Sequence, residues 1–147
     1  MFYAGLALAG LSGLALLGLY LLPEPEDPFQ LVRHPAEPWL RTVHIFAAPV
    51  LVFAVGMLWR SHIQPNLTSG RRNRLSGWSA LLCFFAGGVS GYLYQVAVDE
   101  TVRSAAWTVH VIGSPLLLAA VAGHWLAARR KAREAKNDVP KRKRRAA

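Results

Sequence analysis

Four histidines lie in two long hydrophobic stretches of this 147-residue chain, at spacings that suit the binding of a metal centre. His110 and His124 lie in the segment Ser104 to Ala128, which has no Lys, Arg, Asp or Glu. Their 14-residue step falls about 40° short of four helical turns, so both imidazoles share one helix face, about 21 Å apart along the axis. His44 and His62 are 18 residues apart, about five turns. Ionisable residues within a membrane span are costly without partners, which makes these four imidazoles functional candidates.

The two stretches carry related sequences. TVHIFAAP, which contains His44, recurs 66 residues later as TVHVIGSP around His110. His62, by contrast, lies four residues beyond the position that aligns with His124. In parallel helices, His44 would pair with His110 at one depth and His62 with His124 at another. The four-residue mismatch then predicts a relative helix displacement, a tilted ligand pair or a local distortion near Trp59.

The elements that must position these histidines are four hydrophobic runs. The chain is 53% apolar, and each run approaches or exceeds the length needed to cross a bilayer. We interpret the first run as a retained span, because it lacks the basic region that begins a signal peptide. The sequence predicts an all-α, integral membrane four-helix bundle over residues 1–128. Its runs are Phe2 to Leu22, Thr42 to Trp59, Gly77 to Val98 and Ser104 to Ala128.

Charge predicts the orientation of this bundle. The link between the second and third runs carries four arginines and no acid, and residues 129–147 hold ten Lys or Arg against two carboxylates. The other two connectors are acidic. Because positive segments stay in the cytoplasm, both termini are predicted to be cytoplasmic in a multi-pass protein of the bacterial inner membrane. We interpret residues 129–147 as a disordered basic tail that binds anionic lipid and not nucleic acid.

Paired imidazoles from two helices suit a low-spin haem iron, which takes one axial ligand from each side. The chain has no C-x-x-C-H sequence for covalent attachment, so the sequence predicts non-covalent haem b. We expect two haems, and at least the one held by His44 and His110. Arg41 and Arg103 could pair with haem propionates, and Gly91 would let a flat macrocycle approach the backbone.

With its His-x13-His run, parallel histidine-bearing partner and glycine-rich neighbouring spans, the chain resembles the di-haem, four-helix cytochrome b subunits of membrane oxidoreductases. These include the cytochrome b of quinol–cytochrome c reductases and the gamma subunits of formate dehydrogenases and nickel–iron hydrogenases. The resemblance implies an electron-transfer subunit of a membrane redox complex that works between quinone and a periplasmic partner such as a c-type cytochrome. The 17 residues between His44 and His62, in place of 13, depart from that pattern.

Two alternatives stay open, and whether the chain is itself an enzyme is not decided by the sequence. In the first, His44 and His110 hold a single haem and His62 or His124 binds a quinone. In the second, the chain is a cofactor-free assembly or transport protein. A quinol site beside His34, with Tyr94 and Asp99 near it, is a further expectation, because an imidazole and a carboxylate can accept the two protons released on oxidation.

Overall fold

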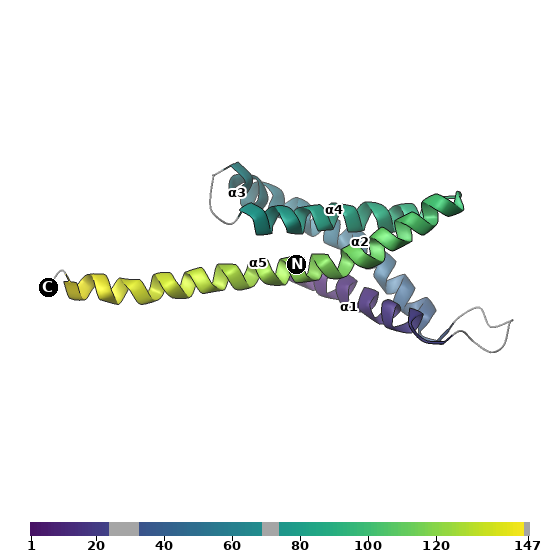
Figure 1. Ribbon diagram of the computed structural model, residues 1–147, viewed down its shortest axis with the longest axis horizontal. Helices are drawn as coiled ribbons and strands as arrows, with labels where there is room; N and C mark the ends of the chain where they lie inside the picture. The colour runs from purple at the N-terminus through teal and green to yellow at the C-terminus, as the bar shows by residue number, and fades with distance from the viewer. Residues whose placement is uncertain (24–32, 69–73, 146–147) are drawn as a thin grey trace.

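A computed structural model describes residues 1–23, 33–68 and 74–145, which are almost entirely helical (Figure 1). Four of the helical stretches are long and apolar enough to cross a membrane, which confirms the predicted all-α class and the four candidate spans. The elements are α1 (Phe2–Tyr20), α2 (Glu37–Leu58), the π-helix η1 (Trp59–Ile63), α3 (Gln64–Thr68), α4 (Arg74–Val96) and α5 (Glu100–Arg145).

The helices pack as two hairpins. α1 packs along α2, and α4 packs along α5, while α1 also contacts α5. In Figure 1 the C-terminal end of α1 and the turn between α4 and α5 lie at one end, which we call the connector end, and α3 and the C-terminal part of α5 lie at the other. α2 and α5 therefore run in the same direction, as the histidine pairing requires. A contact between the Tyr20 and Trp107 rings, with centroids 4.9 Å apart and planes at 53°, joins the hairpins near the connector end.

Local chemistry explains how the helices begin at the connector end. α2 has Pro38 in its first turn, where the missing N–H is not needed. The side chain of Asp99 accepts a hydrogen bond of 2.9 Å from the amide of Val102 and so caps α5. The guanidinium of Arg33 lies 4.8 Å from the centre of the Tyr20 ring and donates to the carbonyl of Tyr20, which fastens the connector to the end of α1.

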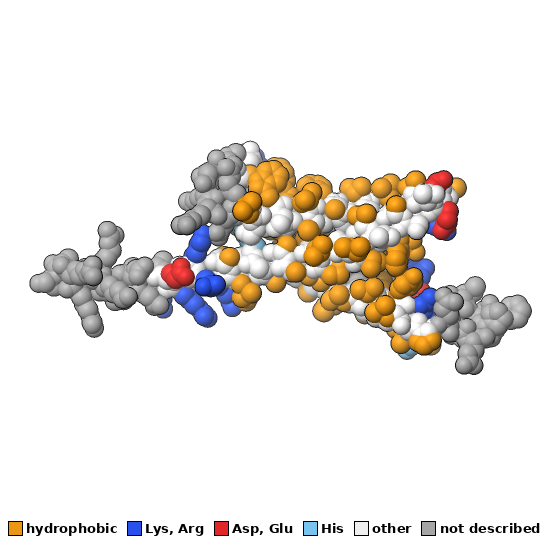
Figure 2. Space-filling model, viewed as in Figure 1, with side chains coloured by type: hydrophobic (Ala, Val, Ile, Leu, Met, Phe, Trp, Pro, Cys, Tyr) orange, Lys and Arg blue, Asp and Glu red, His pale blue; other side chains and the backbone are white. Residues whose placement is uncertain are grey.

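Small residues fill the contacts inside the bundle, and large apolar side chains face outward. Ala47 and Ala54 are buried, and a Cβ added at Gly5 would lie only 3.5 Å from the backbone of Leu51. Phe46 and Leu82, in contrast, are each 70% exposed. Figure 2 shows hydrophobic side chains covering the middle of the molecule and charged ones gathering toward its ends. Small buried residues and large exposed apolar ones are typical of helices that associate in lipid, where an apolar side chain gains nothing by moving from lipid into the protein interior.

α5 differs from its predicted extent. We expected a disordered tail from Arg129, but the backbone continues as one helix to Arg145. Ala, Arg and Lys make up most of this segment and are among the strongest helix formers, so propensity can extend the helix beyond the span. The guanidinium of Arg129 lies 3.6 Å from the centre of the Trp125 ring, at the start of this extension.

Candidate functional site

The four predicted histidines meet as two pairs across the bundle. The rings of His44 on α2 and His110 on α5 have centroids 5.9 Å apart and planes at 77°. The rings of His62 on η1 and His124 on α5 have centroids 6.1 Å apart and planes at 86°. We call them the connector-side pair and the α3-side pair, after the nearest end of the bundle. The structure thus brings together the residues that the depth pairing grouped.

These separations fit an iron placed between each pair. Two metal–nitrogen bonds of about 2 Å, with about 1 Å from each nitrogen to its ring centroid, put the centroids of two coaxial imidazoles about 6 Å apart. Within the described residues, no three side chains among His, Cys, Asp and Glu converge on one point. Two imidazoles are nevertheless all that a protein must add to a macrocycle that supplies four nitrogens.

The His44 ring is fixed by the neighbouring helix α1. Its Nδ1 lies 2.9 Å from the carbonyl oxygen of Ala9 and 3.1 Å from the hydroxyl of Ser12. The Ser12 hydroxyl donates to the carbonyl of Leu8 and is therefore free to accept from Nδ1. A carbonyl can only accept, so Nδ1 carries the proton and Nε2 keeps its lone pair. This arrangement presents His44 to a metal through Nε2 and orients its ring.

The His110 ring is fixed in the same way by α4. Its Nδ1 lies 2.9 Å from the carbonyl oxygen of Gly87, so this imidazole also carries its proton on Nδ1. Ser90, one turn along α4, is buried and donates to the carbonyls of Ala86 and Gly87. The connector-side pair therefore has both Nε2 atoms available as ligands, with each ring tied to the backbone of a separate helix.

This match between hairpins reflects a sequence repeat that the histidine alignment alone does not reveal. The segment AGLSG, from Ala9 to Gly13, corresponds to GGVSG, from Gly87 to Gly91, at an offset of 78 residues. The histidines repeat at an offset of 66, because the step from Ala9 to His44 is 35 residues and the step from Gly87 to His110 is 23. Each hairpin thus contributes one histidine and the carbonyl that orients it.

The α3-side pair is held more loosely. The Nδ1 of His124 lies 3.0 Å from the hydroxyl of Ser76 on α4. A hydroxyl can donate or accept, so it fixes the ring's tautomer less firmly than a carbonyl does. His62 is exposed, whereas His44, His110 and His124 are half-buried. Ser76 is a further site residue that the sequence prediction did not identify.

The π-helix η1 lies where the four-residue mismatch predicted a local distortion. It covers Trp59–Ile63 and includes His62. A π-helical turn closes i→i+5 hydrogen bonds, so it takes up more residues per turn than an α-helix. A single turn of this kind takes up about one extra residue, so it absorbs part of the four-residue mismatch. The predicted local distortion near Trp59 is therefore present, and His62 lies beside His124.

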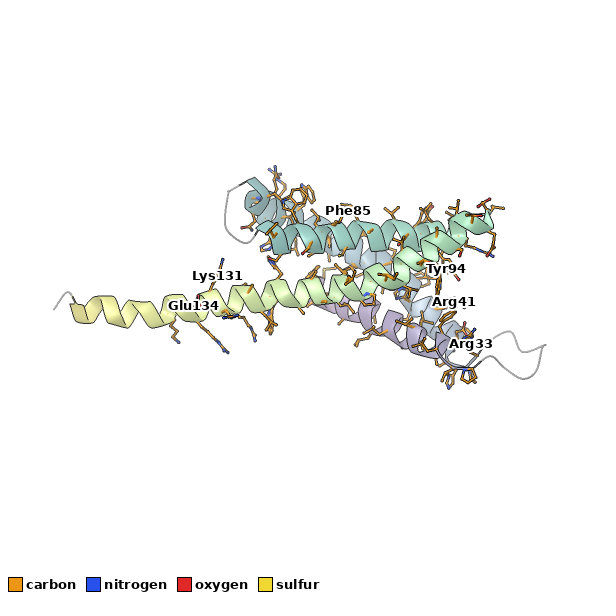
Figure 3. The ribbon with its side chains drawn as sticks, viewed as in Figure 1. Arg33, Arg41, Phe85, Tyr94, Lys131 and Glu134 are labelled. Carbon is orange, nitrogen blue, oxygen red and sulfur yellow. The ribbon has the colours of Figure 1, made fainter. Side chains whose placement is uncertain are left out.

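The predicted supporting residues have these positions. Arg41 pairs with Glu37 at 2.5 Å, and Arg103 pairs with Glu100, each within one helix. Both arginines lie within two turns of a connector-side histidine, and Figure 3 shows Arg41 at the connector end. Arg103 and Glu100 are both exposed, and pairs of this kind contribute about 0.3–0.5 kcal/mol, so Arg103 could turn to a propionate at little cost. Their pairing with propionates stays a prediction.

Gly91 lies against a histidine. A Cβ built at Gly91 would come within 2.7 Å of the His110 ring, and one built at Gly13 within 2.8 Å of the His44 ring. The approach of a macrocycle to Gly91, which the sequence predicted, stays a prediction.

The residues of the expected quinol site are engaged locally. A ring nitrogen of the exposed His34 accepts a hydrogen bond of 3.0 Å from the amide of Ala36. Asp99 caps α5 through its carboxylate. Tyr94 is exposed near the connector end of α4 (Figure 3). His34 and Asp99 thus have structural contacts that do not involve a quinol.

Comparisons of the chain with protein families, with curated proteins and with solved structures found no match.

Proposed function

We propose that the chain is a membrane-embedded b-type di-haem cytochrome that carries electrons across the bilayer. The observation that supports this most strongly is the pair of facing imidazoles at each of two depths, with centroids 5.9 and 6.1 Å apart. When bound, haem b supplies one-electron oxidation and reduction at its iron, and the protein supplies the axial ligands and their surroundings.

The chain's own residues perform three tasks in this proposal. His44 and His110 would hold one haem, and His62 and His124 the other, about 21 Å apart along α5. The carbonyls of Ala9 and Gly87 keep the proton of each connector-side imidazole on Nδ1, so that Nε2 keeps its lone pair for a metal. The apolar side chains that cover the bundle allow both sites to lie within the membrane.

The orientation and the partners are also part of the proposal. Basic residues at the α3 end and acidic connectors at the opposite end support cytoplasmic termini in a bacterial inner membrane. The connector-side pair would then lie toward the periplasm. Exchange of electrons with membrane quinone and with a periplasmic partner such as a c-type cytochrome, inside a larger complex, rests on the family resemblance. Anionic lipid at the basic end of α5 is expected from charge alone.

One observation favours the mono-haem alternative over the cofactor-free one. The connector-side rings are both tied to backbone carbonyls, whereas His62 is exposed and lies on a π-helical turn. In this second candidate, only His44 and His110 hold haem, and His62 or His124 binds a quinone.

Haem content of the purified protein distinguishes these functions. The chain would be purified in mild detergent, its haem counted as the pyridine complex, and its protein counted by amino-acid analysis. The di-haem proposal predicts two haems b per chain and sharp bands on reduction. One haem per chain would favour the mono-haem anchor, and none in a folded, haem-supplied preparation would refute both.

A further inference from the structure

Two glycines on separate helices lie directly against the connector-side imidazoles. A Cβ at Gly13 on α1 would lie 2.8 Å from the Cε1 atom of His44, and a Cβ at Gly91 on α4 would lie 2.7 Å from both Cε1 and Nδ1 of His110. Real Cβ atoms essentially never come this close to a neighbour. The two helices therefore need glycine here because an imidazole occupies the space of a side chain.

Each imidazole is held on two sides. His44 rests on Gly13 and donates from Nδ1 to the carbonyl of Ala9, one turn earlier on α1. His110 rests on Gly91 and donates to the carbonyl of Gly87, one turn earlier on α4. Rotation of either ring about its Cβ–Cγ bond would break the hydrogen bond or press the ring into the helix. The 77° between the two ring planes is thus set by the neighbouring helices.

We propose that Gly13 and Gly91 are positioning residues that fix the crossed orientation of the two axial imidazoles at the connector-side haem. This inference rests on the proposed function, because it concerns ligands to that haem. Crossed ligand planes direct the π-electron donation of the two rings into different iron d orbitals, whereas parallel planes direct it into the same one. The electron paramagnetic resonance (EPR) spectrum of the oxidised protein reports this difference as a change in the low-field g value.

Substitution by alanine tests the assignment in the full chain. In Gly13→Ala and Gly91→Ala, the nearest ring atom must move from 2.8 or 2.7 Å to an ordinary contact of about 3.4 Å from the new methyl group. Gly18→Ala and Gly88→Ala are the matched controls, because a Cβ at either position has no neighbour within 4 Å. All four changes replace glycine with alanine in a helix, so their effect on helix propensity is alike.

The readouts are the EPR spectrum and the haem content, with the α3-side haem as an internal indicator of folding. We expect Gly13→Ala and Gly91→Ala to shift the low-field g value of the connector-side haem or to remove that haem. The α3-side signal should stay at its wild-type position and occupancy. Gly18→Ala and Gly88→Ala should match the wild type in both signals.

Three results would count against parts of this account. Variants at Gly13 and Gly91 that match their controls would overturn the positioning role while leaving the di-haem proposal intact. Loss of both haems in these variants, with both haems retained in the controls, would also overturn it, since the effect would be on folding. A wild-type protein that binds no haem would instead refute the proposed function itself.

Discussion

The hydrogen-bond partner of Nδ1 determines how firmly each candidate ligand ring is held. At His44 and His110, Nδ1 donates to a backbone carbonyl, which cannot rotate away or exchange its role as acceptor. At His124 the corresponding group is the hydroxyl of Ser76, which can turn. Such outer groups orient a ligand and raise its basicity, so these differences should appear as differences in haem retention.

Replacement of Ser76 tests this difference directly. We predict that Ser76→Ala weakens retention of the α3-side haem by roughly 10- to 100-fold, because His124 loses the hydrogen bond that orients its ring. Haem loss would be followed by transfer to an excess of apomyoglobin. Ser79→Ala is the control, since the exposed Ser79 donates to the carbonyl of Ser76 and not to a histidine. Equal rates for the wild type and Ser76→Ala would contradict the assigned role.

At the scale of elements, the hydrophobic runs predicted the spans well because lipid selects for uninterrupted apolar helices. The repeated TVH sequence predicted the pairing of His44 with His110, since a duplicated helix keeps its register. The contribution of α1 to the histidine site could not be predicted from residue types. Ala9 contacts His44 through its backbone carbonyl, which every residue has. In the sequence, Gly13 cannot be told from a glycine that allows close helix packing. Its contact with the His44 ring appears only in the structure.

The π-helix was predictable only as one of several possibilities. The mismatch between His62 and His124 required some adjustment, but helix displacement and a tilted ligand pair would have met the same requirement. A π-helical turn changes which carbonyl each amide reaches, and no residue type in WRSHI specifies that change. The helical continuation of α5 past Arg129 was also not predicted. The prediction gave the strong positive charge of this segment more weight than the helix propensity of its residues.

The π-helical turn also predicts which haem is lost first. His62 is exposed and lies on a segment whose hydrogen bonds differ from those of the rest of its helix. We expect mild detergent or pH stress to release the α3-side haem before the connector-side haem. His62→Ala should remove the α3-side haem and leave the other spectrally intact. Stepwise reduced-minus-oxidised spectra measure this order, and simultaneous loss of both haems would contradict it.

For the molecule as a whole, the proposed topology has the acidic connectors and the basic end of α5 on opposite sides of one membrane. The first connector and the start of α5 carry acidic residues, and the chain beyond Ala128 is strongly basic. This separation predicts the orientation because translocating Lys and Arg is disfavoured. It also predicts which haem meets which compartment.

Cysteine labelling tests this orientation, since Cys83 is the sole cysteine of the chain and can be replaced. In a Cys83→Ser background, Val98→Cys places a thiol in the second connector, where the wild-type side chain is 97% exposed. Ala132→Cys places one on the exposed extension of α5. We predict that a membrane-impermeant maleimide labels Val98→Cys in intact spheroplasts and Ala132→Cys only after the membrane is opened. The reverse pattern would invert the proposed topology.

The most direct test of the central claim is the haem content of His44→Ala, His110→Ala and the variant that carries both changes. If the two residues ligate one iron, each single variant should keep one haem per chain, and the double variant should also keep one. The retained haem should have the same spectrum in all three, because it is the one held by His62 and His124. A double variant with no haem, or single variants that keep different haems, would show that His44 and His110 do not share an iron.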